Sequence, residues 1–104
     1  MKPLVIVSTT LEEKEDAERL ARLLLERKLI ACAQISAPIT SIYRWEAVTT
    51  SATEFTLNLK TTPQHLKEVR LLLSQEHPYD LPEIIVQEVN ASDDYATWVY
   101  GEVQ

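Results

Sequence analysis

The chain has 104 residues and a mass of 11.9 kDa, and its 10 Lys and Arg against 16 Asp and Glu give a formal net charge of −6 at pH 7. This acidic balance repels phosphate backbones and anionic lipid, so nucleic acid and membrane surfaces are not expected partners. The only glycine is Gly101, which excludes both a phosphate-binding loop and a dinucleotide fingerprint, because each needs several glycines.

The length and the lack of linkers or low-complexity tracts predict one domain over residues 1–104. The single cysteine, Cys32, cannot form an intrachain disulfide, which fits a reducing compartment. Residues 1–8 carry one positive charge and an apolar stretch that is too short for a signal peptide. The sequence therefore predicts a cytoplasmic protein.

The first half of the chain alternates between apolar runs and one amphipathic stretch. Residues 4–7 predict a buried strand, after which Thr9 or Thr10 can cap a helix whose apolar stripe extends to Lys28. Residues 30–35 predict a second strand. A β-ribbon follows, with one strand over 42–48, a polar turn over 49–53 and a returning strand that alternates with period two.

The second half repeats this order. Thr62 and Pro63 predict the start of a second helix, with a capping hydroxyl and a proline at the first helical position. That helix ends at His77, since the residue before Pro78 disfavours helical geometry. Residues 84–89 predict another strand, and Ser92 begins a short C-terminal helix.

The fold class is α+β: a ferredoxin-like, split β-α-β-β-α-β sandwich with a short C-terminal helix. Two helices cover only one face of such a sheet, so the other face would be an apolar surface in water without a partner. Association of identical chains would cover that face and the exposed edges of the ribbon. The alternative is a monomer whose terminal helix covers the open face.

Several segments, in order, resemble the CutA family of divalent-cation tolerance proteins. They are Val7-Ser8-Thr9, residues 29–35, Thr40-Ser41-Ile42-Tyr43-Arg44-Trp45, Lys60-Thr61-Thr62, residues 77–84 and Tyr95-Ala96-Thr97-Trp98. The resemblance covers nearly the whole chain. It implies a ferredoxin-like homotrimer similar to PII signalling proteins, with a role in tolerance of copper and other divalent cations.

The chain departs from the pattern that the resemblance implies for copper. The family's ligand set is similar to a cysteine at the end of the first strand and a His-His pair before Pro-Tyr, where this chain has Ser8, Glu76 and His77. Only His77 is kept, and a thiolate that would select Cu(I) is missing from the first strand. The family's ribbon glycine is Ala47 here, which predicts a change in turn geometry.

His77 is the predicted metal ligand. Together with Asp80 and Glu83 it could bind copper(II), zinc(II) or nickel(II), and an oligomer axis could multiply one ligand into several. The alternative is a histidine that caps the carbonyl groups at the end of a helix. His65 has the pattern of a solvated surface residue.

Two aromatic residues and two charged residues form the other candidate site. Tyr43 and Trp45 lie on one face of a predicted strand, and with Lys60 and Glu83 they could line a ligand cleft between subunits. The alternative is that the aromatic residues anchor a subunit interface. Cys32 is predicted to pack as a small hydrophobic residue in the core, with its thiol as a candidate site only through the resemblance.

No nucleophile with a visible base partner supports catalysis, so the sequence predicts a protein that is not an enzyme. Two functions remain open. One is a trimeric protein of divalent-cation (copper) tolerance, and the other is a PII-like signalling, small-molecule or partner-binding module with intersubunit clefts.

Overall fold

The computed structural model describes residues 1–103. In chain order the elements are β1 (Lys2–Leu11), α1 (Lys14–Glu26), β2 (Cys32–Ile35), β3 (Ile39–Trp45), β4 (Val48–Thr61), a 3₁₀ turn (Pro63–His65) that leads into α2 (Leu66–Glu76), β5 (Ile85–Ala91) and α3 (Asp93–Glu102). None of the described helices is long and apolar enough to cross a bilayer.

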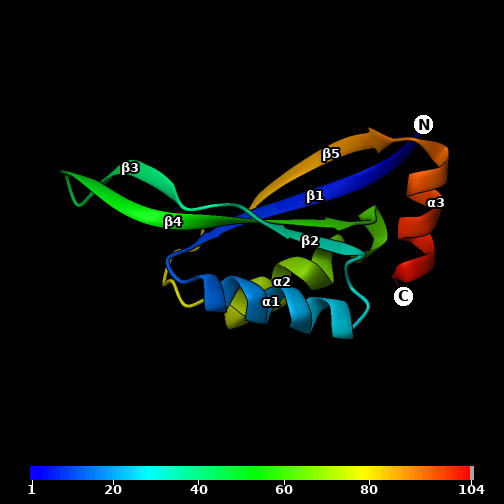
Figure 1. Cartoon of the computed structure of the whole chain (residues 1–104), viewed down its shortest axis with the longest axis horizontal. Helices are drawn as coiled ribbons and strands as arrows, with labels where there is room; N and C mark the ends of the chain where they lie inside the picture. Colours follow the sequence, from blue (N-terminus) through cyan, green and yellow to red (C-terminus); the bar gives the residue numbers. More distant parts are fainter. Residues whose placement is uncertain (104) are drawn as a thin grey trace.

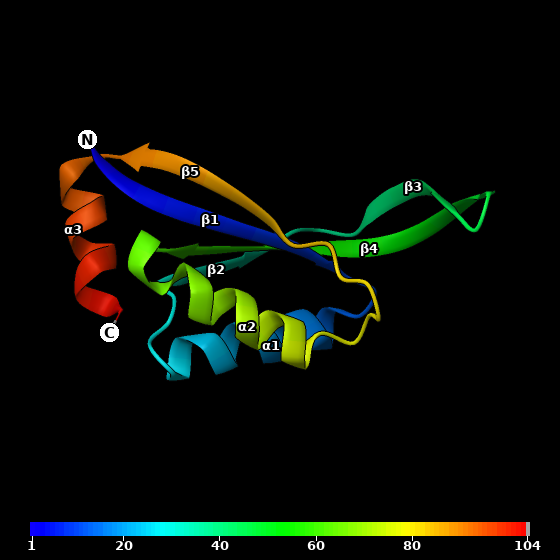
Figure 2. The same cartoon turned by 180° about the vertical axis from the view of Figure 1, so that it is seen from behind.

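The strands form one antiparallel sheet in the order β2-β4-β1-β5, and β3 pairs with the part of β4 that extends beyond the body. Helices α1 and α2 lie side by side on one face of this sheet, and α3 lies at its end (Figures 1 and 2). This order and layering confirm the predicted ferredoxin-like fold.

The core lies between the sheet and the two long helices. Every second residue of the central strands faces the helices, as the period-two pattern predicted, and Val7 is paired with Leu59 across β1 and β4. Both side chains are fully buried against Leu20, Leu24 and Leu73. Each buried leucine side chain stabilises the fold by roughly 1.5–3 kcal/mol.

The predicted cap is wrong at the start of α1, and at the second helix only its position is confirmed. Thr9 and Thr10 do not cap α1, because β1 continues through them in register with β4 and the helix begins only at Lys14. Thr62 does precede a helical turn that begins with Pro63. Its hydroxyl, however, lies 2.7 Å from Nδ1 of His65 and caps no backbone N–H group.

Helix α1 ends at Glu26 in a Schellman motif. The prediction that the helix extends to Lys28 is therefore wrong. Lys28 has a φ of 57°, its N–H donates to the Leu25 carbonyl, and the N–H of Leu29 donates to the Leu24 carbonyl. Glycine usually occupies this left-handed position because a side chain there is strained. The apolar contact between Leu29 and Leu24 in the core accompanies the motif.

Beyond the body, β3 and residues 48–54 of β4 form a two-stranded extension, here called the arm (Figure 1). It makes the molecule elongated, with extents of 45 × 25 × 23 Å. The turn at its end is Glu46-Ala47, with φ angles of 48° and 67°, and not residues 49–53 as predicted. Two successive positive φ angles match the right-handed twist of the flanking strands.

The open face of the sheet is more polar than predicted. In the middle of it the Ser8 hydroxyl donates a 2.6 Å hydrogen bond to Oδ1 of Asn58, and Lys60 lies two residues further along β4. Helix α3 covers only one end, where Leu4 is buried with Ala96. The face therefore needs less apolar cover than the sequence suggested, and α3 does not span it.

Candidate functional site: an acidic, aromatic groove

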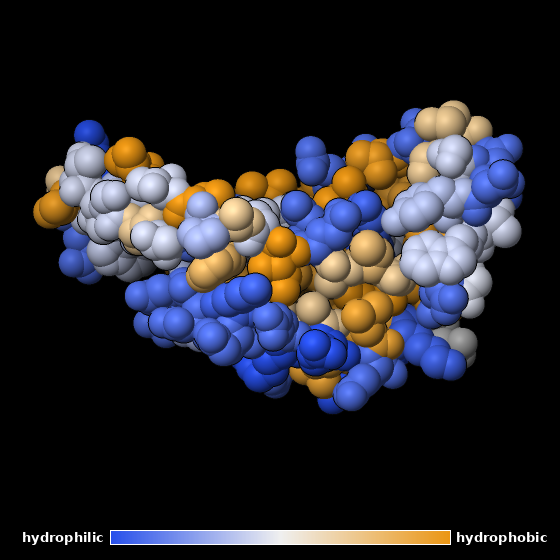
Figure 3. Space-filling view, viewed as in Figure 1, coloured by the Kyte–Doolittle hydropathy of each residue, from blue (hydrophilic) through white to orange (hydrophobic). Residues whose placement is uncertain are grey.

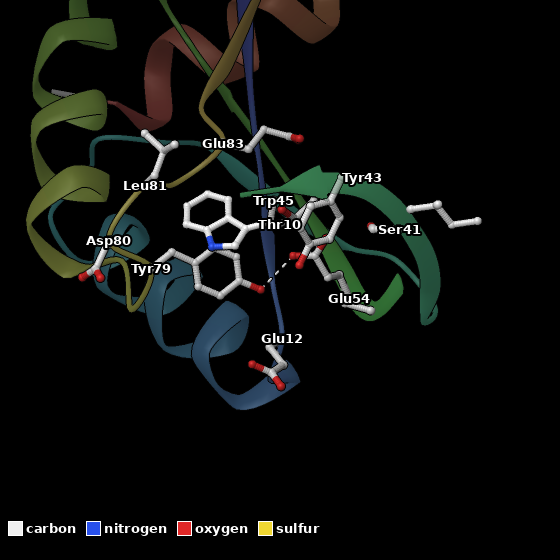
Figure 4. A pocket seen from close by; sticks show the side chains of 12 residues that line it. Thr10, Glu12, Ser41, Tyr43, Trp45, Glu54, Tyr79, Asp80, Leu81 and Glu83 are labelled. Atoms are coloured by element: carbon white, nitrogen blue, oxygen red, sulfur yellow. Dashed lines mark hydrogen bonds between the residues drawn. The ribbon is translucent and has the colours of Figure 1, made fainter. Parts of the chain in front are cut away.

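A groove with a volume of about 720 Å³ lies where the arm passes the end of β1 and the loop after α2. Its lining residues are Thr10, Glu12, Ser41, Ile42, Tyr43, Trp45, Ala52, Glu54, Tyr79, Asp80, Leu81 and Glu83 (Figure 4). Of these described residues, four carry carboxylates and none is a lysine, arginine or histidine.

The arm positions one wall of the groove. Because side chains alternate along a strand, Ser41, Tyr43 and Trp45 project to the same side of β3. The opposite wall is the loop of residues 77–84, whose backbone bends over residues 78–81 and in which Pro78 and Pro82 each have a fixed φ angle. In Figure 4 Glu54 lies beside Tyr79 and Tyr43, Glu83 lies above the aromatic rings and Glu12 below them, and the carboxylate of Asp80 points away from Trp45.

Glu54 and Tyr79 join the two walls. The Tyr79 hydroxyl donates a 2.7 Å hydrogen bond to Oε2 of Glu54, whose side chain is only 9% exposed. Burial disfavours the ionised carboxyl, but the hydroxyl groups of Ser41, Tyr79 and Thr10 outweigh it and lower the pKa of Glu54. Burial and the neighbouring carboxylate raise the pKa of Tyr79 well above its usual value. The pair is therefore a neutral phenol bound to a carboxylate.

His77 lies behind the groove wall and is 8% exposed. The N–H of Tyr79 donates to its Nδ1 over 3.1 Å, so the ring proton is on Nε2, which lies 3.1 Å from the Thr10 carbonyl oxygen and 2.9 Å from the Thr9 hydroxyl. Burial lowers the pKa of His77, and the Arg19 charge acts in the same direction. The hydrogen bond to Thr10 and the negative charges of Asp16 and Glu54 oppose that shift.

The structure gives the predicted metal ligand no free ring nitrogen. Metal binding at His77 stays a prediction, and it would require the ring to break its bond with Tyr79 or with β1. The other two positions of the implied ligand set are also engaged, since Ser8 bonds to Asn58 and Glu76 forms a 3.2 Å ion pair with Arg19. Residues 1–103 contain no group of three His, Cys, Asp or Glu side chains arranged to hold a metal ion.

The other predicted site residues separate into two places. Tyr43, Trp45 and Glu83 meet at the groove, whereas Lys60 lies on the open face of the sheet with its Nζ 5.6 Å from the ring centre of Tyr95. Cys32 is half-buried at the start of β2, opposite Lys60, and belongs to neither buried core cluster. Its predicted packing in the core is wrong, because Cys32 shares the side of the sheet with Lys60, whereas the neighbouring Ala33 pairs with Leu59 and packs against the core.

Sequence reasoning missed most of the groove. Glu12, Ser41, Glu54 and Tyr79 come from three segments that are distant in the sequence, so no spacing could place them together. One signal was available: Glu54 is an acidic residue next to the apolar, period-two run of the returning strand. Such a residue must find hydrogen-bond donors if it is buried.

Comparisons with known proteins give consistent matches over nearly the whole chain. The family model described as CutA1 divalent ion tolerance protein matches residues 5–102. The divalent-cation tolerance protein CutA of Pectobacterium atrosepticum is 35% identical over 101 residues, which cover 96% of this chain and 92% of that protein. The crystal structure of the divalent ion tolerance protein CutA1 from Ehrlichia chaffeensis has a TM-score of 0.93 at 41% identity, covering 98% of this chain and 96% of that one.

A third similar structure corrects the predicted location. It is described as the periplasmic divalent cation tolerance protein CutA from Archaeoglobus fulgidus, with a TM-score of 0.92, 33% identity and coverage of 97% of this chain and 99% of that one. This contradicts the prediction of a cytoplasmic protein. The physical reason is that one cysteine cannot form an intrachain disulfide in any compartment, so its presence does not distinguish a reducing compartment from an oxidising one.

Proposed function

Because the chain belongs to the CutA1 divalent ion tolerance family, we propose that it contributes to divalent-cation tolerance as a homotrimer and that copper(II) is among the cations it binds. One observation carries the cation part of this proposal. The groove is lined by Glu12, Glu54, Asp80 and Glu83, and no lysine or arginine is among its described lining residues.

Charge favours cations at this groove. The whole chain has a net charge of −6, and carboxylates beside low-dielectric walls raise the local concentration of cations. Copper(II) accepts carboxylate oxygen and imidazole nitrogen. In this proposal, the carboxylates provide a weak, dispersed site, and His77 would join it only by giving up its bond with Tyr79.

Exposed apolar side chains on the arm support the trimer. Trp45 is 52% exposed, Ile42 72% and Val48 63%, on an extension that its own body covers only in part. Figure 3 shows apolar residues at the end of the arm and between the arm and the body, whereas the surface over α1 is hydrophilic. Exposed apolar side chains on an extension of this kind are typical of an interface between subunits.

A second candidate function is a PII-like module that binds a small molecule in the groove. The aromatic side chains of Tyr43, Trp45 and Tyr79 favour it, since small-molecule sites combine aromatic walls with a few fixed polar groups. The matching proteins carry names of tolerance proteins and not of enzymes, and the proposal includes no catalytic step.

The test is a calorimetric titration of metal-free protein with Cu²⁺. We expect Glu12→Gln/Glu83→Gln to weaken binding at least fivefold. The matched control Glu26→Gln/Glu102→Gln removes the same charge from exposed positions outside the groove and should bind as the wild type does. Loss of binding in His77→Ala but not in Glu12→Gln/Glu83→Gln would place the ligand at the imidazole and overturn the groove. Light scattering should give about three times the chain mass.

A further inference from the structure

We propose that the groove recognises a small organic cation, with an ammonium or guanidinium group held between the aromatic side chains of the arm and the Glu54 carboxylate. This inference rests on the second candidate function, ligand binding in the groove, and gives that ligand a chemical class. Four features of the groove carry it: its charge, its aromatic residues, its volume and the absence of a metal-ion ligand set.

The charge of the groove selects for positive ligands. Glu54 lies at its inner end with a fixed carboxylate, because Tyr79 donates a hydrogen bond to Oε2 and the side chain is almost fully buried. Glu12 and Glu83 add negative charge at the rim, and no basic side chain among the described lining residues neutralises them. An anionic ligand would meet repulsion from every charged group in this lining.

The aromatic residues favour a cation that is large and weakly hydrated. Tyr43 and Trp45 stand on the same side of β3, and within one chain they are 43% and 52% exposed, so each ring has area left to contact a ligand or a neighbouring chain. The negative face of an aromatic ring attracts ammonium and guanidinium groups, most strongly in tryptophan. A small, strongly hydrated metal ion gains less from such walls, since it keeps its water.

Volume and ligand geometry also separate the two kinds of cation. The groove of about 720 Å³ falls within the roughly 300–1,000 Å³ of small-molecule sites and is much larger than a single ion needs. No three His, Cys, Asp or Glu side chains of residues 1–103 are arranged around one point as a tightly coordinated metal ion requires, so a metal ion at the groove would be held only weakly. A molecule of several heavy atoms could contact both the Glu54 carboxylate and the aromatic rings of Tyr43 and Trp45.

The test uses choline and its neutral carbon isostere 3,3-dimethyl-1-butanol, which have nearly the same shape and differ in charge. Trp98→Phe leaves Trp45 as the only tryptophan, so its fluorescence reports the groove directly. We expect choline to change this emission saturably and to bind at least tenfold more tightly than the isostere. A parallel titration with methylguanidinium decides whether the groove prefers an ammonium or a guanidinium group.

Variants locate the binding. Calorimetry should show choline affinity at least tenfold lower in Glu54→Gln and in Trp45→Leu. Tyr95→Leu removes an aromatic side chain outside the groove and should leave affinity unchanged. If Glu54→Gln fails to fold, Glu12→Gln/Glu83→Gln tests the charge from exposed positions. Equal affinity for choline and the isostere, or no binding of either cation, would overturn the inference.

The copper titration separates this inference from the proposed function. Copper binding without choline binding would remove the organic-cation site and leave the metal role intact. Choline binding without copper binding would remove the copper site and leave the organic-cation site intact.

Discussion

The hydroxyl of Tyr79 and the carboxylate of Glu54 are 2.7 Å apart, and their hydrogen bond connects the loop after α2 to the strand that carries the arm. The bond therefore fixes how far the loop stands from the arm, and with it the width of the inner end of the groove.

Tyr79→Phe should lower the free energy of unfolding by about 1–2 kcal/mol, because a hydrogen bond to a charged, buried group is lost. The same change at Tyr100, whose hydroxyl donates to the Pro3 carbonyl at an exposed position, should cost less. Urea unfolding of both variants checks this. A double-mutant cycle with Glu54→Gln that shows no coupling between the two positions would contradict the assignment.

Stability should fall as pH decreases from about 6.5, because the folded state lowers the pKa of His77. A group with a lowered folded-state pKa binds more protons when unfolded, so its contribution is fully present above pH 6.5 and is lost as pH falls through the folded-state pKa. Unfolding free energies measured between pH 7.5 and 5 in buffer with a chelator should show this slope in the wild type and a smaller one in His77→Gln.

The control for this pH dependence is His65→Gln, since His65 is the other histidine of the chain. Its partner is the hydroxyl of Thr62, and it is not part of the buried contact with β1. His65→Gln should keep the wild-type slope. If the slope disappears in His65→Gln and persists in His77→Gln, His77 is not the cause of the pH dependence.

Ala47→Gly should stabilise the protein by about 0.5–1 kcal/mol, because Ala47 has a φ of 67° that glycine adopts without strain. Gly101→Ala should do the same, since Gly101 lies within α3 and an added Cβ would meet no atom within 4 Å. Ala52→Gly, inside β4, is the opposite control and should destabilise. Thermal unfolding of the three variants checks all three signs.

Trp45→Asp should reduce the particle mass in light scattering, because a charge on the arm must be desolvated for chains to associate through it. Leu71→Asp places the same charge on α2 at a residue with the same exposed fraction, 52%, and should keep the wild-type mass. An unchanged mass for Trp45→Asp would exclude the arm as the interface.

The sequence predicted the order of elements because hydrophobic periodicity is a local property, as at Leu57 and Leu59. It could not predict that His77 is buried, since the partner of its ring is Thr9, 68 residues away. It also misplaced the turn of the arm, because Glu46 and Ala47 adopt positive φ angles without the glycine or asparagine that usually signals them. The groove depends on three distant segments, so only the tertiary structure brings it together.

Strand β4 spans Val48–Thr61 without a break and serves two parts of the molecule. Its first half is one side of the arm, and its second half lies between β1 and β2, with Leu57 and Leu59 fully buried. One continuous strand therefore joins the arm to the centre of the sheet. When a ligand or a neighbouring chain binds to the arm, we expect the backbone hydrogen bonds of the central sheet to be affected as well. A changed rate of amide hydrogen exchange at Leu57 would show this.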